Sequence, residues 1–173
     1  MNKAVILQLL RQNVPELFTS TGQLLYIGAC VRHFTAAREL HQAGHHITIL
    51  EVWRPWLDKL MESDQAKYVD KAICGDIQNF SANGYDYVLW LHGPEHVEKE
   101  VARQVLERLS TMAETIVIGC PDGWMANPAR DGNPHAEHKS AWQVADFKRL
   151  GWQVARAGDE LLAWKQKQAA KGL

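Results

Sequence analysis

The sequence predicts an α/β fold: one domain with a mostly parallel seven-stranded sheet and helices on both of its faces. Apolar runs of strand length alternate with helical apolar periods from about residue 22 to residue 165. Such alternation is typical of a mostly parallel sheet. The length of 173 residues suits a single domain, and the 46% of apolar residues are enough for a sizeable core.

The clearest strand–helix–strand unit lies between Leu24 and Glu51. An apolar run from Leu24 to Ile27 predicts the first strand, and a small-residue turn begins at Gly28. Gly44 ends the helix that we expect next, before a second strand and Glu51. That helix should bury residues spaced three apart: Val31, Phe34, Ala37 and Leu40. A right-handed connection makes the two strands parallel neighbours, so their carboxyl ends share the sheet edge where such sheets bind ligands.

The first strand and its turn resemble the first motif of class I S-adenosylmethionine (SAM)-dependent methyltransferases, in which a strand with an acidic residue precedes G-x-G-x-G. Gly28 matches the first glycine, whereas Tyr26 stands at the acidic position and Cys30 and Arg32 stand at the later glycines. The resemblance implies a Rossmann-like three-layer sandwich that binds SAM. A dinucleotide needs bare backbone near its pyrophosphate, which side chains at Cys30 and Arg32 obstruct, whereas SAM carries no phosphate.

Two acidic positions complete the expected cofactor site. Glu51 ends the second strand, where a carboxylate can accept hydrogen bonds from two ribose hydroxyls. Asp76 and Ile77 follow the third strand, and the resemblance implies that they contact adenine; a plain Gly-Asp turn is the alternative. The predicted cofactor-binding residues are Gly28, Ala29, Cys30, Glu51, Val52, Asp76, Ile77 and His92.

The loop after the fourth strand is expected to face both cofactor and acceptor. The run YDYVLWLHGPEHVEKE resembles the fourth motif of the same family, and its strand spans Tyr87 to Leu91. His92, Glu95 and His96 then occupy the loop. Glu95 and His96 are equally compatible with a plain helix start, because an acidic group there favours the helix dipole. The apolar spacing from Val97 onward predicts a long helix.

Residues 121–140 form the longest stretch without a periodic pattern. Loops of this length in a compact domain are usually functional or disordered, and the sequence leaves open whether this one is a lid or an interface. The run from Gly132 resembles a recurring tail of small methyltransferase-like proteins, with the pattern N-P-x-x-x-H-x-S. The matching residues are Asn133, Pro134, His138, Ser140, Trp142, Phe147 and Gly151.

Histidines are the natural candidates for acid–base roles, because imidazole titrates near neutral pH. His92, His96 and His138 are the predicted catalytic residues. We expect the histidines of the helix between the first two strands, and of its end, to be solvated: His33, His41, His45 and His46. No metal site is predicted, since Gly93-Pro94 separates His92 from His96 and neither H-E-x-x-H nor paired cysteines occur.

The remaining elements are expected from local patterns. An N-terminal helical segment spans residues 1–21, the core spans 22–165 and a frayed tail spans 166–173. Arg54-Pro55 opens a helix. That helix should bury Trp56, Leu57, Leu60 and Met61. The later elements are strands at Tyr68–Cys74, Thr115–Cys120, Trp152–Ala155 and Leu161–Trp164, with a helix at Val144–Leu150.

Composition and charge indicate which partners and which cellular compartment we expect for the protein. A net charge of −1 gives no sign of a nucleic-acid or anionic-membrane partner, and no apolar run is long enough to span a bilayer. The start of the chain lacks a signal-peptide pattern. Three cysteines without paired spacing predict reduced thiols in a cytoplasmic protein: Cys30, Cys74 and Cys120. The oligomeric state is not indicated.

Three function classes are left by these patterns. The favoured one is a SAM-dependent methyltransferase that acts on a small-molecule acceptor. The second is a methyltransferase-like protein that has lost catalysis and serves as a binding or structural module. The third, a nicotinamide-dependent oxidoreductase, is disfavoured because the glycines that would lie against a pyrophosphate are replaced at Cys30 and Arg32.

Overall fold

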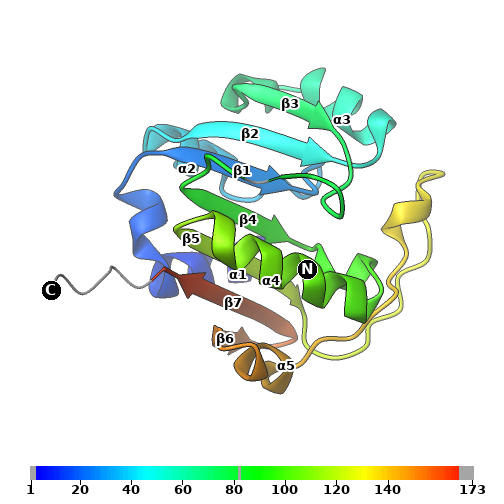
Figure 1. Cartoon of the computed structure of the whole chain (residues 1–173). Helices are drawn as coiled ribbons and strands as arrows, with labels where there is room; N and C mark the ends of the chain where they lie inside the picture. The colour runs from blue at the N-terminus through cyan, green and yellow to red at the C-terminus, as the bar shows by residue number, and fades with distance from the viewer. Residues whose placement is uncertain (1–2, 82, 168–173) are drawn as a thin grey trace, which may run out of the picture.

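A computed structural model describes residues 3–81 and 83–167 (Figure 1). Its centre is one seven-stranded sheet with the strand order β3-β2-β1-β4-β5-β7-β6. The strands are β1 (Gln23–Ile27), β2 (His46–Glu51), β3 (Lys71–Cys74), β4 (Tyr87–Leu91), β5 (Thr115–Pro121), β6 (Gln153–Ala157) and β7 (Glu160–Gln166).

The pairing of the strands confirms the predicted topology. β1 pairs in parallel with β2 and β4, β2 pairs in parallel with β3, and β4 pairs in parallel with β5. β7 runs antiparallel to both β5 and β6, so the chain ends in a hairpin. The carboxyl ends of β1 to β5 therefore share one edge, on the right in Figure 1, and residues 121–140 extend from that edge.

Helices cover both faces of the sheet, as predicted. α1, α2 and α3 pack with Leu24 and Tyr26 of β1 on one face, whereas α4 and α5 pack with Leu25 and Ile27 on the other. Side chains alternate between the two faces along a strand, so β1 is buried on both sides. The helices are α1 (Lys3–Asn13), α2 (Ala37–Gln42), α3 (Arg54–Met61), α4 (Lys99–Met112) and α5 (Val144–Arg149), with short 3₁₀ turns η1 (Pro15–Phe18), η2 (Ala66–Tyr68), η3 (Pro94–His96) and η4 (Pro134–Ala136).

The prediction of a helix directly after the glycine turn is wrong for the first half of that helix. α2 begins only at Ala37, and Val31 is 38% exposed instead of buried. Ala36 has a left-handed backbone with φ of 61°, which no α-helix accommodates. The buried Tyr26 hydroxyl accepts the N–H of Thr35 at 3.0 Å and donates to the carbonyl of His33 at 3.2 Å. These bonds hold the residues before Ala36 as a loop.

Three smaller boundaries also differ from the prediction. Met61 is 38% exposed and Trp56 is half-buried, so α3 buries only Leu57 and Leu60. β3 begins at Lys71, because η2 occupies the start of the expected strand. β7 runs to Gln166, the first residue of the predicted frayed tail, and residues 168–173 of that tail lie outside the described residues.

Two findings concern membrane-spanning helices and the pairing of the cysteines. Within the described ranges, the helices are too short or too polar to cross a membrane. All three cysteines are unpaired, and Cys30 and Cys120 are buried.

Candidate functional site

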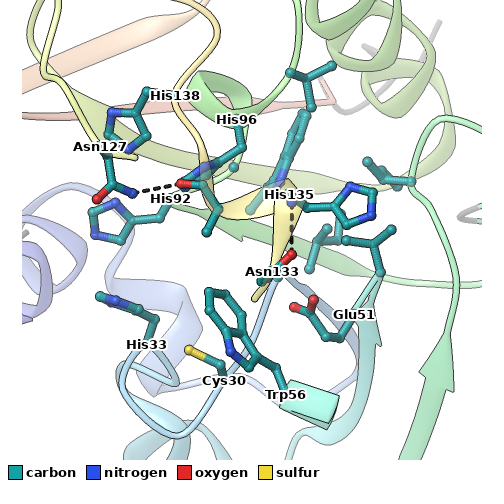
Figure 2. Close-up of a pocket in the computed structure, with 18 of the residues that line it drawn as sticks. Cys30, His33, Glu51, Trp56, His92, His96, Asn127, Asn133, His135 and His138 are labelled. Atoms are coloured by element: carbon teal, nitrogen blue, oxygen red, sulfur yellow. Dashed lines mark hydrogen bonds between the residues drawn. The ribbon is translucent and has the colours of Figure 1, made fainter. Parts of the chain in front are cut away.

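A cavity of about 640 Å³ opens at the carboxyl edge of the sheet (Figure 2). The loops after β1, β2, β3 and β4 form its floor and walls, and residues from the 121–140 segment line the rest. This volume is within the usual range of small-molecule pockets. We call Gly28, Glu51, Asp76 and Ile77 the glycine end, and His92, Glu95, His96 and His138 the histidine end.

Gly28 lets the chain turn sharply at the end of β1. Its φ of 75° is a left-handed value that glycine adopts without strain, and its N–H donates to the Leu50 carbonyl at 2.8 Å. A Cβ at this position would meet nothing closer than the His92 carbonyl oxygen at 3.8 Å. The backbone at Gly28 is thus open to the cavity.

Glu51 is a buried carboxyl at the cavity wall, 3% exposed. Its Oε1 accepts the N–H of Trp53 at 2.8 Å. Burial raises the pKa of Glu51 to about 7, and the backbone N–H groups of Trp53 and Val52 offset only part of that rise. A buried carboxylate with so few donors is well suited to bind ligand hydroxyls.

The turn after β3 is closed by Asp76 and lines the cavity. Asp76 closes a local turn, with Oδ1 accepting the Gln78 N–H at 2.9 Å, and it also lines the cavity. Ile77 is buried at the cavity wall. Arg108 of α4 donates to the carbonyls of Ile77 and Gln78, which anchors this turn to the helix.

The loop after β4 is folded tightly over Trp90. A Cβ at Gly93 would lie 1.7 Å from the Trp90 Nε1, so only glycine fits there. His92 has a φ of 58°, a left-handed value that a histidine adopts at a cost of about 1–3 kcal/mol. Its N–H donates to the Gly119 carbonyl at 2.8 Å, which holds this geometry.

The histidine end is strongly desolvated. The His92 Nδ1 lies 3.0 Å from Oε1 of Glu95, whose side chain is only 3% exposed. Burial lowers the pKa of His92 to about 3 and raises the pKa of Glu95. Burial also lowers the pKa of His96, an effect that the nearby Glu95 only partly opposes. Figure 2 shows His92, His96 and His138 on the same side of the cavity.

The 121–140 segment is internally hydrogen-bonded. The Asn133 side chain accepts the His135 N–H at 2.8 Å and so caps η4. Asn127 donates its Nδ2 to the Ala136 carbonyl at 2.7 Å, and its own carbonyl accepts the N–H of His138 at 3.0 Å. The segment is therefore an ordered wall of the cavity.

Ser140 fastens this wall to the loop after β4. Its hydroxyl donates to the Pro94 carbonyl at 2.9 Å and accepts the Trp142 indole N–H at 3.0 Å. The backbone N–H groups of Lys139 and Ser140 both donate to the Glu95 carbonyl, at 2.7 and 3.1 Å. These bonds set His138 beside His96.

All but one of the predicted site residues line the cavity. The three predicted catalytic histidines do so, as do the predicted cofactor residues on β1, β2 and the β3 turn apart from Ala29. Ala29 is fully buried in the core cluster below the turn, because the chain rotates its side chain inward after Gly28.

Several pocket residues were missed or misassigned from sequence. His33, expected to be solvated, lines the cavity with its ring 5.1 Å from that of His92, and burial lowers its pKa to about 4. His45, also expected to be solvated, is buried with Nε2 2.9 Å from the Leu17 carbonyl oxygen. Trp56 lines the cavity instead of the core. The apolar spacing of α3 does not distinguish a tryptophan that packs in the core from one that lines the pocket.

Comparisons with known proteins place this geometry among solved folds. No protein-family model and no curated protein matches the sequence. Among solved structures, the PH0226 protein from Pyrococcus horikoshii OT3 is similar over 95% of this chain and 91% of its own, at 12% identity and a TM-score of 0.69. Magnesium protoporphyrin IX methyltransferase from Synechocystis PCC 6803, solved with bound SAH, covers 96% of this chain and 83% of its own, at 14% identity and a TM-score of 0.67.

The chain has the class I methyltransferase fold. A third similar structure, the N-terminal domain of EvdMO1 with SAH and D-fucose, agrees over 97% of this chain and 84% of its own, at 15% identity and a TM-score of 0.68. In this methyltransferase fold, the cavity described above lies at the carboxyl edge of the parallel strands, the edge at which open α/β sheets bind ligands.

Proposed function

We propose that this protein is a SAM-dependent methyltransferase that acts on a small-molecule acceptor. The observation that carries the proposal is Glu51: a buried carboxyl at the tip of β2 that faces the cavity beside the open backbone of Gly28. Two ribose hydroxyls supply the donors that this carboxylate lacks. The similar folds solved with SAM or SAH support the choice of cofactor.

The cofactor is proposed to lie along the glycine end. Its ribose contacts Glu51 and Val52, and its adenine lies against Ile77 with its amino group towards Asp76. Its methionine part passes Gly28 and Cys30 and points its methyl group towards His92. All of these residues line one continuous cavity.

The acceptor is proposed to occupy the histidine end. Transfer forms a bond from an acceptor lone pair to the methyl carbon, while the carbon–sulfur bond breaks and its electron pair stays on sulfur. An acceptor hydroxyl or amine also loses a proton to a base or to solvent. His92, His96 and His138 surround this position and hold the acceptor for in-line attack. Three unpaired cysteines are in keeping with a cytoplasmic location.

A degenerate, non-catalytic methyltransferase fold is the second candidate, and Tyr26 favours it. Its hydroxyl is committed to Thr35 and His33, at the position where the resembled motif has an acidic group. Arg32 is exposed at the cavity mouth, where its charge faces a cationic sulfonium. At an effective dielectric of about 20, unit charges about 6 Å apart repel by roughly 3 kcal/mol.

Calorimetric titration with SAM, SAH and NAD tests the proposal. We expect SAM and SAH to bind with one site per chain and NAD not to bind. Glu51→Ala should weaken SAM binding by roughly tenfold or more, because the ribose hydroxyls lose their acceptor. Glu62→Ala, on the exposed surface after α3, is the matched control and should bind normally. Failure of the wild type to bind SAM, with binding restored in Arg32→Gly, would establish the degenerate alternative.

A further inference from the structure

Three side chains of the histidine end converge on one point. Glu95 and His96 come from η3, and His138 comes from the 121–140 segment. One ligand-type atom from each lies within 4.8 Å of the other two. The rings of His96 and His138 stand at 76° to each other with centroids 4.7 Å apart.

The backbone fixes the tautomers of both histidines. The Nδ1 of His96 lies 3.2 Å from the Glu137 carbonyl oxygen, and the Nδ1 of His138 lies 2.6 Å from the Met125 carbonyl oxygen. A carbonyl oxygen only accepts, so each Nδ1 carries the proton when the ring is neutral. Each Nε2 then carries a lone pair. This arrangement, with Nδ1–H bound to a backbone carbonyl, is the usual support of a metal-ligating histidine.

Glu95 is the third member of the cluster and is buried next to His96. Its side chain is 3% exposed, and its Oε1 lies 3.9 Å from the His96 Nε2, too far for a hydrogen bond. Its Oε2 is buried without a hydrogen-bond partner among residues 3–81 and 83–167. Glu95 Oε2 thus lacks a donor that would offset its burial, and a bound cation would satisfy this oxygen together with the two Nε2 lone pairs.

We propose that Glu95, His96 and His138 bind a divalent transition-metal ion at the acceptor end of the pocket. Two imidazoles and one carboxylate suit zinc, manganese or iron, whereas magnesium and calcium favour all-oxygen sites. Donors around one tetrahedral ion lie roughly 3.3 Å apart, whereas Glu95 Oε1 and His96 Nε2 are 3.9 Å apart, so the side chains move closer together when the ion binds.

Neighbouring groups fit the same site. His92 lies with Nδ1 3.0 Å from Oε1 of Glu95 and orients the carboxylate as a positioning residue. His96 and His138 line the cavity, so an ion held by three protein ligands keeps open positions that face the pocket. The sequence missed this site because His96 pairs with His138 and not with His92.

The site also narrows the acceptor class, an extension that rests on the proposed function. An ion with open positions binds oxygen atoms, so the acceptor presents a hydroxyl or carboxylate to the metal. Coordination fixes that oxygen and makes its proton easier to lose. We therefore infer an oxygen-bearing acceptor whose reacting atom is held at the histidine end.

The metal site is tested without SAM. Chelator-treated wild type is titrated with Zn²⁺ and with Mn²⁺ by calorimetry, and bound metal is counted after dialysis. One ion per chain is expected. His96→Ala and His138→Ala should each weaken binding roughly a hundredfold, and His92→Ala tenfold to a hundredfold. The control is His135→Ala, a histidine of the same segment outside the cluster, which should bind like wild type.

Two results overturn the proposal. One is the absence of stoichiometric metal binding by the wild type. This result does not depend on whether any variant folds. The other is metal affinity in His96→Ala and His138→Ala equal to that of His135→Ala, with all three shown to be folded by circular dichroism. A parallel titration with SAM distinguishes this outcome from failure of the proposed function. Metal binding without SAM binding would support the metal site and contradict only the methyltransferase proposal.

Discussion

The two ends of the pocket are built in different ways. At the glycine end, each residue lies at the last position of a parallel strand or within three residues after it, and the positions are set by local turns at Gly28 and Asp76. At the histidine end, η3 meets a segment that arrives from beyond β5, and Ser140 fastens the two together. The first end depends on sheet topology alone, whereas the second also depends on a long-range contact that single substitutions can break.

The largest effect is expected from Gly93→Ala, which disrupts the histidine end. An added Cβ would overlap the Trp90 ring at 1.7 Å, so the loop after β4 must move. We expect about 3 kcal/mol of lost stability, measured by urea denaturation. Gly84→Ala is the control: Gly84 has a positive φ, unlike Gly93, but a Cβ there meets nothing within 4 Å, so about 1 kcal/mol is expected. Equal losses in the two variants would contradict this account.

Glu51→Gln tests the glycine end through the pH dependence of the free energy of unfolding. The folded pKa of about 7 lies above the ordinary value of 4.5, so the unfolded chain ionises first as pH rises. Wild-type stability should therefore fall between pH 4.5 and 7, by about 3 kcal/mol in total, and the cost persists above pH 7. The amide is neutral throughout. The variant should match wild type near pH 4 and exceed it at pH 8.5 in denaturant titrations; a pH-independent difference would refute a buried, proton-binding Glu51.

Tyr26→Phe separates loop support from core packing. The ring remains buried against Phe34, but the N–H of Thr35 and the carbonyl of His33 lose their partner. We expect about 2 kcal/mol of lost stability in thermal or urea unfolding. Amide exchange should accelerate at Thr35 more than in β1. Unchanged exchange at Thr35 would mean that the hydroxyl does not hold the loop.

Ser140→Ala gives the smallest change in stability, about 1 kcal/mol, because the Pro94 carbonyl and the Trp142 indole each lose one bond. Its informative effect is on binding. Metal affinity should fall, since the segment that carries His138 loosens, while SAM affinity stays at the wild-type value. Ser110→Ala, an exposed hydroxyl on α4 bonded only to its own helix, is the control. A fall in SAM affinity with metal affinity intact would reverse the assignment of the two ends.

Sequence patterns predicted the sheet and the glycine end because both follow from local periodicity. Parallel topology brings strand ends together whatever the loops do, so Gly28 and Glu51 could be placed without coordinates. The start of α2 could not be placed in the same way. Its apolar spacing persists through Val31, but a tertiary hydrogen bond from the Thr35 N–H to the Tyr26 hydroxyl overrides it.

The histidine end was only partly predictable for a related reason. His92, His96 and His138 were recognised as polar groups near the pocket, but the partner of each depends on how residues 121–140 fold back. Glu95 was ambiguous between a helix start and a site residue, and only its burial next to His96 distinguishes the two. His33 was misassigned because it was placed on a helix face that does not form.

The central claim is that SAM occupies the glycine end independently of the histidine end. The most direct test is the calorimetric dissociation constant for SAM in wild type, Glu51→Ala and His138→Ala, measured at one pH and without added metal. Wild type should bind SAM, Glu51→Ala should lose roughly tenfold or more in affinity, and His138→Ala should change it by less than about twofold. Unchanged SAM binding in Glu51→Ala, or an equal loss in His138→Ala, would contradict the claim.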